Sequence, residues 1–209
     1  MKRSKGNVDD RLEAGNNSSE FGPGRVGAGW IPGSWREYIR RIRMKRASKI
    51  ILVIFTFLSC VGCDQVTKNI ARQNLVTGES FSYFGNLFRF QYTENPGAFL
   101  SLGAGANEQI RFFIFTVLVG LFLAGLAFYL IVSKQVTKTE AIALSMVIGG
   151  GFANLMDRIS NNGRVIDFMN MGIGPIRTGI FNVADVEILL GIFWILTLRL
   201  KRQEPRCHN

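Results

Sequence analysis

The chain has 209 residues, of which 47% are hydrophobic and 19% charged, and its mean hydropathy is +0.17. A soluble domain usually has about 25% charged residues, so this composition excludes a disordered chain and argues against an ordinary soluble domain. The net charge of +10 would suit a nucleic-acid-binding protein if the basic residues were spread over one fold.

The basic residues instead gather at the two ends of the chain. Residues 1–46 have a net charge of +6 and residues 199–206 a net charge of +3, which leaves a nearly neutral apolar middle. Basic clusters that flank apolar blocks are typical of membrane proteins. We therefore expect contact with membrane lipid and no nucleic-acid partner.

Residues 1–43 form a polar and basic N-terminal extension. Residues 1–35 are rich in Gly, Ser, Asn and charge and have little apolar periodicity, which predicts disorder. Met44 begins the sequence MKRASKIILVIF, so native translation from Met44 is a hypothesis. N-terminal sequencing of the native protein tests it, and a chain that begins upstream of Met44 would refute it.

Four apolar blocks follow, at residues 50–63, 112–132, 141–156 and 188–198. The second block has 21 uncharged residues, and at about 1.5 Å per residue such a helix spans a hydrocarbon core of ~30 Å. The other three blocks are shorter, so each must draw flanking residues into the membrane, and those residues include acids. Residues 44–200 are thus predicted to form an α-helical membrane protein, a bundle of four transmembrane helices.

Lysine and arginine placement predicts the orientation of this bundle. Basic residues precede the first block and follow the fourth, and Lys134 and Lys138 lie between the second block and the third. If all three groups are cytoplasmic, both termini lie inside and residues 201–209 form a basic cytoplasmic tail. The loops at 64–111 and 157–187 are then extracytoplasmic.

The first outer loop contains the aromatic, alternating stretch FSYFGNLFRFQY, at residues 81–92. Alternation of this kind, interrupted by Gly, predicts strands. We expect a small extracytoplasmic β-sheet subdomain at about residues 75–105.

Four aspartates are expected at the outer ends of the helices. Asp64 and Asp157 end the first and third blocks, Asp185 begins the fourth, and Asp167 lies in the loop between the last two. Ionisable groups at membrane depth are costly and usually functional. Asp167 close to Asp185 would form a like-charge pair that shares a proton, so one carboxylate could activate water while the other donates to a carbonyl oxygen. The alternative for Asp167 is a surface turn.

Two asparagines each precede an aspartate by three residues: Asn154 before Asp157, and Asn182 before Asp185. Residues at this spacing share one face of a helix, so each amide could project beside its carboxylate. Helix capping is the alternative, and it suits Asn182 better than Asn154, which lies inside an apolar block.

Asn95 and Gly97 lie in the loop NPGAFLSLG, where they could meet a substrate or simply form an Asx–Pro turn. Arg158 could orient a carboxylate or bind a polar substrate group, and the alternative is a snorkelling interfacial arginine. The glycines at 149–151 favour close packing of helices.

Metal and nucleophilic chemistry have little support. Cys60 and Cys63 form a CxxC pair, but the chain has a single histidine, His208, so we expect neither a metal site nor a cofactor. Lys68 is the only lysine of the two outer loops, and no serine stands out near it as the nucleophile of a Ser-Lys pair.

Five short motifs, taken in chain order, resemble the signature blocks of lipoprotein signal peptidase (signal peptidase II). The resemblance covers about residues 45–200, and residues 1–43 lie outside the family pattern. The motifs are DQVTK (64–68), NPGAFLSLG (95–103), GGGFANLMDR (149–158), VIDF (165–168) and FNVAD (181–185).

This resemblance implies an aspartyl endopeptidase of the bacterial cytoplasmic (inner) membrane, with four transmembrane helices and a small extracytoplasmic sheet. Its substrates would be diacylglyceryl-modified prolipoproteins, cut before the lipidated cysteine, and globomycin-type peptides would inhibit it. It would act as a monomer, near the extracytoplasmic face, without metal or cofactor.

The resemblance also implies roles for individual residues. Asp167 and Asp185 match the catalytic pair. The positions that match substrate-binding, inhibitor-binding or supporting residues are Asp64, Lys68, Asn95, Gly97, Asn154, Asp157, Arg158 and Asn182.

Two other functions stay open on the sequence. In the first, block one is the signal peptide of a lipoprotein cleaved at Cys60 or Cys63, which an intact-mass measurement would detect. In the second, the chain is a small transporter or channel component with intramembrane acids on an ion path. A cleavage assay with a lipid-modified signal peptide separates both from a peptidase.

Overall fold

The computed structural model describes residues 46–97, 103 and 105–203. The helices are α2 (Arg46–Asn74), α3 (Glu108–Phe112), α4 (Val119–Val132), α5 (Lys138–Ser160) and α6 (Val183–Gln203), and a π-helical segment, Phe113–Leu118, joins α3 to α4. The strands are β1 (Phe81–Tyr83), β2 (Phe88–Asn95), β3 (Val165–Ile173) and β4 (Ile176–Arg177). The predictions for residues 1–43 and for most of the C-terminal tail lie outside the described residues.

Three helical stretches are long and apolar enough to cross a membrane: Ala47–Asn74, Glu108–Val132 and Lys138–Ser160. They match the first three apolar blocks, so the prediction of an α-helical membrane protein is confirmed. Helix α6 is not among them, since acids at its start and basic residues at its end leave only the short uncharged stretch 188–198. The fourth span therefore stays a prediction.

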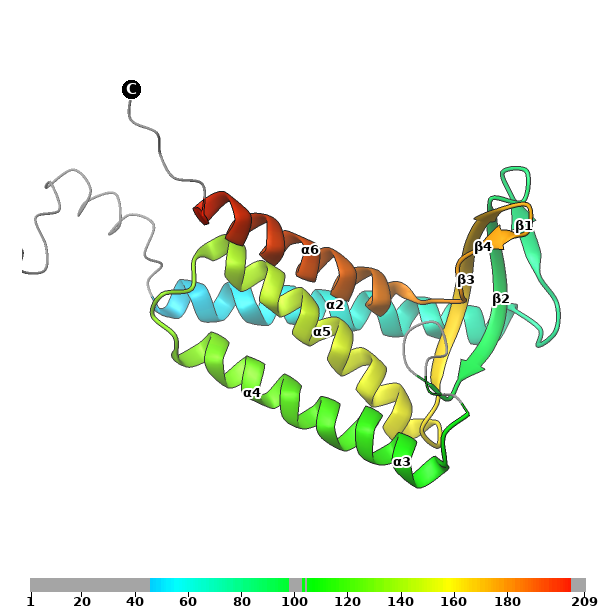
Figure 1. Ribbon diagram of the computed structural model, residues 1–209, viewed down its shortest axis with the longest axis horizontal. Coiled ribbons are helices and arrows are strands. Elements are labelled where there is room, and N and C mark those ends of the chain that lie inside the picture. The colour runs from blue at the N-terminus through cyan, green and yellow to red at the C-terminus, as the bar shows by residue number, and fades with distance from the viewer. Residues whose placement is uncertain (1–45, 98–102, 104, 204–209) are drawn as a thin grey trace, which may run out of the picture.

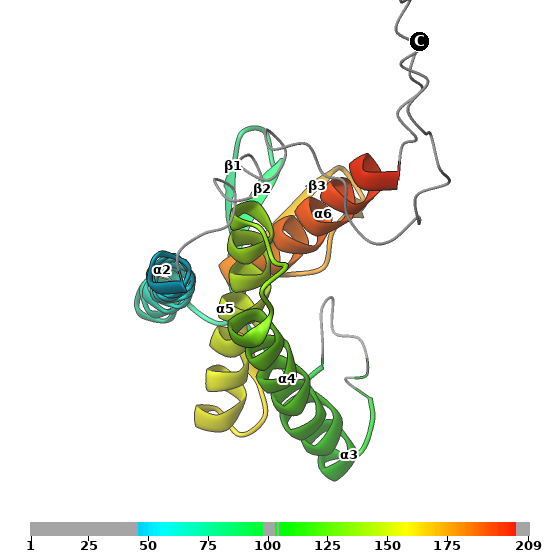
Figure 2. The same ribbon diagram turned by 90° about the vertical axis from the view of Figure 1, so that its left-hand side faces the viewer.

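Helix α5 is the central element of the bundle. It packs against α2, α4 and α6, and the end-on view shows it between them (Figure 2). Of its most apolar 18 residues 61% are buried, against 11% for α2 and 17% for the α3–α4 stretch. The outer helices instead expose large apolar side chains such as Phe55 and Leu121, as expected for a surface in contact with lipid.

Three consecutive glycines make this central position possible. A Cβ atom on Gly149 would lie 2.8 Å from Cys60 Cβ of α2, and one on Gly150 would lie 2.6 Å from the Ala184 carbonyl oxygen of α6. A Cβ atom on Gly151 would lie 2.8 Å from the Leu123 side chain of α4. Each glycine thus allows the close approach of a different neighbouring helix, which confirms the interpretation of these glycines as packing positions.

A four-stranded antiparallel sheet, in the order β1-β2-β3-β4, lies at one end of the bundle (Figure 1). The start of α2, the α4–α5 connection and the end of α6 lie at the opposite end. Strands were predicted within residues 81–92, and β1 and β2 confirm them. The sequence interpretation missed β3 and β4, and Asp167 therefore lies in a strand and not in a loop.

Helix α2 is longer than its apolar block. It continues without a break through Cys60, Cys63 and Asp64 to Asn74. Cys60 is buried against α5, which makes it part of the bundle packing. This extension carries the last three turns of α2 up to the sheet.

Candidate active site

Asp167 and Asp185 reach a common cavity of about 280 Å³ from different elements, β3 and the first turn of α6. Asn95, Asn154 and Arg158 add the other polar side chains of this cavity. The rest of the cavity wall is largely apolar and includes residues of the π-helical segment, α4 and α6. Two acids thus lie beside a space that has both a polar and an apolar side.

Two asparagine amides hold the carboxylate of Asp167. Asn95 Nδ2 donates to Asp167 Oδ2 at 2.8 Å, and Asn182 Nδ2 donates to Asp167 Oδ1 at 2.7 Å. The amide orientation of Asn95 follows from its other contact, because Asn95 Oδ1 accepts a hydrogen bond from Gly97 N at 2.8 Å. Both oxygens of Asp167 are therefore fixed by neutral donors.

The carboxylate of Asp185 is held in a similar way. Asn154 Nδ2 donates to Asp185 Oδ1 at 3.0 Å, and the backbone N–H of Asn182 donates to Asp185 Oδ2 at 3.2 Å. In return, the backbone N–H of Asp185 donates to Asn182 Oδ1 at 2.9 Å, the reciprocal pattern of a helix capping box. Asn182 thus caps α6 and also contacts both acids, so it is both a helix cap and a residue of the site.

Asn154 links the two acids to a buried lysine. Its Oδ1 accepts from Lys68 Nζ at 2.8 Å and from Asn182 Nδ2 at 3.1 Å, so its Nδ2 must face Asp185. Because Asn154 lies inside α5, it makes these contacts from the middle of a helix and does not cap one.

Lys68 forms the centre of an ion cluster that Asn154 links to Asp185 at the cavity. Its Nζ lies 2.7 Å from Asp64 Oδ2 and 2.9 Å from Asp157 Oδ2. The three side chains are 2%, 0% and 4% exposed, so all three charges are buried and are tolerated only because they are paired.

The same two aspartates hold the backbone of the active-site elements. Asp64 Oδ1 accepts from Ala184 N at 2.9 Å, and Asp157 Oδ2 accepts from Ile166 N at 3.1 Å. The residues that donate these hydrogen bonds, Ala184 and Ile166, each precede a candidate catalytic aspartate in the chain. The ion cluster therefore positions β3 and α6 relative to α2 and α5.

Gln65 also belongs to this cluster, although the sequence interpretation did not select it. Its Nε2 donates to Asp157 Oδ1 at 2.9 Å and to the Ala153 carbonyl oxygen at 3.3 Å. Gln65 follows Asp64 within the motif DQVTK, and that position was the available signal. The contact leaves both oxygens of Asp157 with a partner.

Arg158 turns toward the protein and does not extend along the membrane surface. Its Nη2 donates to the Gly97 carbonyl oxygen at 2.7 Å, and its Nη1 donates to the Asn154 carbonyl oxygen at 3.2 Å. The guanidinium lies 5.8 Å from the centre of the Phe115 ring, within the range of a cation–π contact. Its buried Nε has no hydrogen-bond partner among the residues that the structure describes.

Burial raises the pKa of Asp167 from its ordinary value of 3.8 to about 7. The negative charge of Asp185 acts in the same direction, while the hydrogen bonds from Asn95 and Asn182 and the charge of Lys68 oppose it. A carboxyl group with this pKa retains a proton during part of the time near neutral pH.

The structure brings every site residue predicted from the sequence into one connected network of hydrogen bonds and ion pairs. The loop NPGAFLSLG is described only at its ends, since residues 98–102 lie outside the described part of the chain. The network joins Asp64, Lys68, Asn95, Gly97, Asn154, Asp157, Arg158, Asp167, Asn182 and Asp185.

Known sequences resemble this chain over most of its length. The sequence model of a family described as signal peptidase (SPase) II matches residues 56–201. The lipoprotein signal peptidase of Syntrophus aciditrophicus is 34% identical over 158 residues, which cover 75% of this chain and 97% of that protein. The lipoprotein signal peptidase of Leifsonia xyli subsp. xyli is also 34% identical, over 75% of this chain and 72% of that protein.

Two solved structures, both of bacterial membrane enzymes determined by the in meso method, have a similar fold. The first has a TM-score of 0.62 at 25% identity and covers 78% of this chain and 93% of that chain. The second has a TM-score of 0.56 at 24% identity and covers 74% of this chain and 94% of that chain.

Proposed function

This chain belongs to the signal peptidase II family of proteases, which process prolipoproteins, and we propose that it removes the signal peptide with water activated between Asp167 and Asp185. The cut falls before a cysteine that already carries a diacylglyceryl thioether. The observation that supports this proposal is the pair of asparagine-held carboxylates at one cavity.

The two aspartates have different proton states in this mechanism. We assign the proton to Asp167, in keeping with its pKa of about 7, and the negative charge to Asp185, whose Oδ2 accepts a backbone N–H. Their like charges make double ionisation unfavourable, which is the general reason why paired carboxyls share one proton. The neutral amides of Asn95, Asn154 and Asn182 fix the oxygens without forcing both acids to ionise.

The reaction begins with a water molecule between the two acids. Asp185 takes one proton from this water, and the water oxygen bonds to the scissile carbonyl carbon. At the same time Asp167 gives its proton to the carbonyl oxygen. Asp185 then passes its proton to the leaving nitrogen as the C–N bond breaks. The hydroxyl proton of the intermediate returns to Asp167 as the carbonyl re-forms, so both aspartates regain their starting states.

The walls of the cavity suit a lipid-modified signal peptide. The apolar side, which includes Phe115, Val119 and Leu189, would accept the hydrophobic part of the peptide. Arg158, with an unpartnered Nε among the described residues, would bind a carbonyl oxygen near the cut. A globomycin-type peptide would inhibit by occupying the same cavity.

We place the enzyme in the bacterial cytoplasmic membrane, with α6 as a fourth span and the site near the extracytoplasmic face. The positive charges at the start of α2, between α4 and α5 and at the end of α6 support this orientation. These three positions lie together at one end of the bundle, opposite the sheet.

The direct test replaces one catalytic acid at a time with its amide isostere. Asp167→Asn and Asp185→Asn should each lower the rate of cleavage of a diacylglyceryl-modified prolipoprotein by at least about 100-fold, because general acid–base catalysis of this kind typically contributes 10²–10⁴. The measurement uses the purified full chain with the lipid-modified substrate, and mass spectrometry of the product locates the cut.

Two controls make the result specific. Asp157→Asn removes a carboxylate of the ion cluster, and it should give a partial loss together with lower thermal stability. Both catalytic variants should instead unfold near the wild-type temperature. Near-normal turnover by either Asp167→Asn or Asp185→Asn would refute the catalytic pair.

A further inference from the structure

A second cavity, of about 550 Å³, lies between the end of α2 and the strands, and it shares no lining residue with the cavity of the two acids. We call it the aromatic groove. On the sheet side it is lined by the rings of Phe81, Tyr83, Phe84, Phe88, Phe90 and Phe168. On the helix side it is lined by the last turns of α2, including Thr67, Ile70 and Ala71.

The β1–β2 hairpin has one aromatic and one polar face. Phe81 pairs with Phe90, and Tyr83 pairs with Phe88, so these four rings share a face. The residues between them form a polar row on the opposite face, in which Ser82, Arg89 and Asn170 are neighbours across three strands. Such a hairpin is suited to lie between an apolar phase and water.

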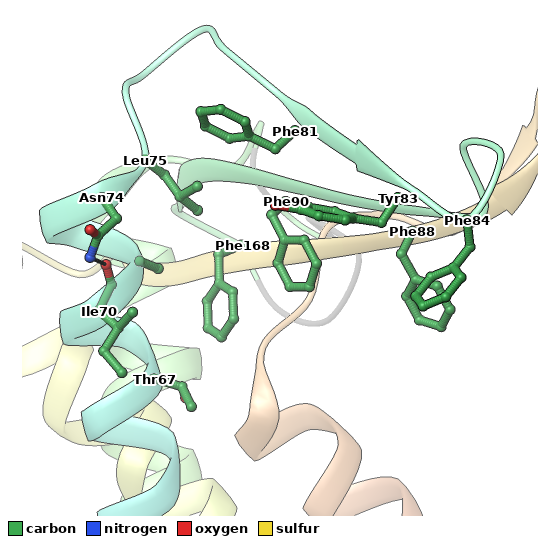
Figure 3. Close-up of a pocket in the computed structure, with 11 residues that line it drawn as sticks. Thr67, Ile70, Asn74, Leu75, Phe81, Tyr83, Phe84, Phe88, Phe90 and Phe168 are labelled. Carbon is green, nitrogen blue, oxygen red and sulfur yellow. Dashed lines mark hydrogen bonds between the residues drawn. The ribbon is translucent and has the colours of Figure 1, made fainter.

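The aromatic face overhangs the flank of α2. In the close-up, the rings of Phe88, Phe90 and Phe168 project from the strands in the direction in which α2 runs back into the bundle (Figure 3). Phe84, at the hairpin turn, is 84% exposed and lies beside Phe88, with ring centres 6.3 Å apart. Because Phe84 is largely exposed and lies beside other exposed or half-buried rings, contact of this apolar patch with water would be costly.

The helix wall of the groove belongs to α2, one of the three described stretches that are long and apolar enough to cross a membrane. Thr67, Ile70 and Ala71 belong to the stretch Ala47–Asn74. Ile70 is 54% exposed and the neighbouring Val66 is 59% exposed, so the exposed apolar side of α2 continues directly into the groove. If α2 crosses the membrane along this length, the groove opens toward hydrocarbon.

From this continuity we infer that the aromatic groove holds a fatty-acyl chain of a membrane phospholipid and that the hairpin thereby lies on the bilayer surface. Bulk phospholipid is the occupant because the groove opens from the lipid-facing flank of α2 and is separate from the cavity of the two acids. The seated chain also supports β2 and β3, the strands that hold Asn95 and Asp167.

The test compares two tryptophan reporters that differ only in the face of β1 on which they lie. Phe81→Trp lines the groove and Ser82→Trp points away from it, and both native side chains are exposed. Each variant is made in a full chain whose Trp30, Trp35 and Trp194 are changed to Phe. The chain is reconstituted without substrate in phosphatidylcholine vesicles whose acyl chains carry bromine, which quenches tryptophan on contact.

We expect brominated acyl chains to quench the Phe81→Trp reporter several-fold more than the Ser82→Trp reporter, and aqueous iodide to give the reverse order. Equal quenching of the two reporters by bromine, or stronger quenching of the Phe81→Trp reporter by iodide, would overturn the proposal. Because no substrate is present, a groove reserved for the lipid of a substrate would also give no bromine quenching, and this result likewise overturns it.

A second variant distinguishes an acyl chain that occupies the groove from an acyl chain that only touches the outside of the sheet. Ala71 is 4% exposed and lines the groove, so Ala71→Leu should fill it and lower the bromine quenching of the Phe81→Trp reporter at least twofold. Unchanged quenching would overturn the seated chain. If Ala71→Leu does not fold, Ile70→Phe narrows the groove from an exposed position and carries the same test.

Discussion

At the scale of single residues, the site separates two kinds of carboxylate by their partners. Asp64 and Asp157 contact the ammonium group of Lys68, which stabilises their charged forms. Asp167 and Asp185 are held by neutral asparagine groups, and Asn154 stands between Asp185 and Lys68. Asp64 and Asp157 thus pair with a cation, whereas the proposed catalytic pair contacts neutral donors.

The first prediction at this scale concerns pH. Because the pKa of Asp167 is about 7 in the fold and about 3.9 in an unfolded chain, the folded protein binds this proton more tightly. The stability that Asp167 contributes is therefore fully present below about pH 4 and is lost as the pH rises through about 7. The cleavage rate should also fall above pH 7, as Asp167 loses the proton that it donates.

Thermal unfolding between pH 5 and pH 8.5 measures the stability part of this prediction, with Asp167→Asn as the control. The amide does not titrate, so the variant should lose less stability than the wild type as the pH rises across this range. Parallel pH profiles for the two proteins would contradict the raised pKa of Asp167. The wild-type cleavage rate, measured over the same range, should turn downward on the alkaline side.

At the scale of elements, the close approach of α5 and α6 sets the distance between Asn154 and Asp185. Gly150 permits this approach, because a side chain there would meet the Ala184 backbone carbonyl, which cannot rotate away. Asp185 follows Ala184 directly, so a displacement of α6 at this point displaces the carboxylate.

We therefore predict that Gly150→Ala lowers both stability and cleavage. Overpacking of this kind costs about 1–3 kcal/mol, and the rate should fall further than the stability alone explains because the site geometry changes. Thermal unfolding and the cleavage assay, made on the same preparation, measure the two effects.

Gly125→Ala is the matched control for that variant. Gly125 also lies within a helix, α4, but nothing lies within 4 Å of a Cβ atom placed there. The change should be neutral or slightly stabilising, since Ala is the better helix former. Equal losses in the two variants would show that glycine conformation, and not the contact with Ala184, is what matters at Gly150.

At the scale of the whole molecule, the sheet and the α4–α5 connection lie at opposite ends of the bundle (Figure 1). If α6 spans the membrane and the basic clusters are cytoplasmic, these two regions face different compartments. We predict that Ser82→Cys, on the sheet, reacts with a membrane-impermeant thiol reagent in intact cells. Lys134→Cys, in the α4–α5 connection, should react only after the membrane is opened.

The labelling uses a chain in which Cys60, Cys63 and Cys207 are replaced by serine, so that each variant has one thiol. Both positions are exposed, which makes their chemical reactivity comparable. Labelling of both in intact cells would contradict the orientation, and labelling of Lys134→Cys alone would invert it.

The sequence by itself determined the features that depend on local pattern. Uncharged runs predicted where the long helices lie. The aromatic alternation at 81–92 predicted the strands β1 and β2, which pair with each other across a short turn. The spacing of Asn182 and Asp185 likewise left helix capping as one interpretation of Asn182, and the structure shows that cap.

Only the tertiary structure decided how these parts meet. The sequence predicts a loop where β3 lies, because the residues of β2 that pair with it lie between 70 (Asn95 with Val165) and 83 (Phe88 with Met171) positions earlier in the chain. No local pattern indicates such a pairing. The position of Lys68 between Asp64 and Asp157, and the separation of that cluster from the catalytic pair by Asn154, depend on the packing of α2, α5 and α6. Periodicity shows which face of a helix is apolar, but the distance between charges on different helices is set by the side chains that pack between them.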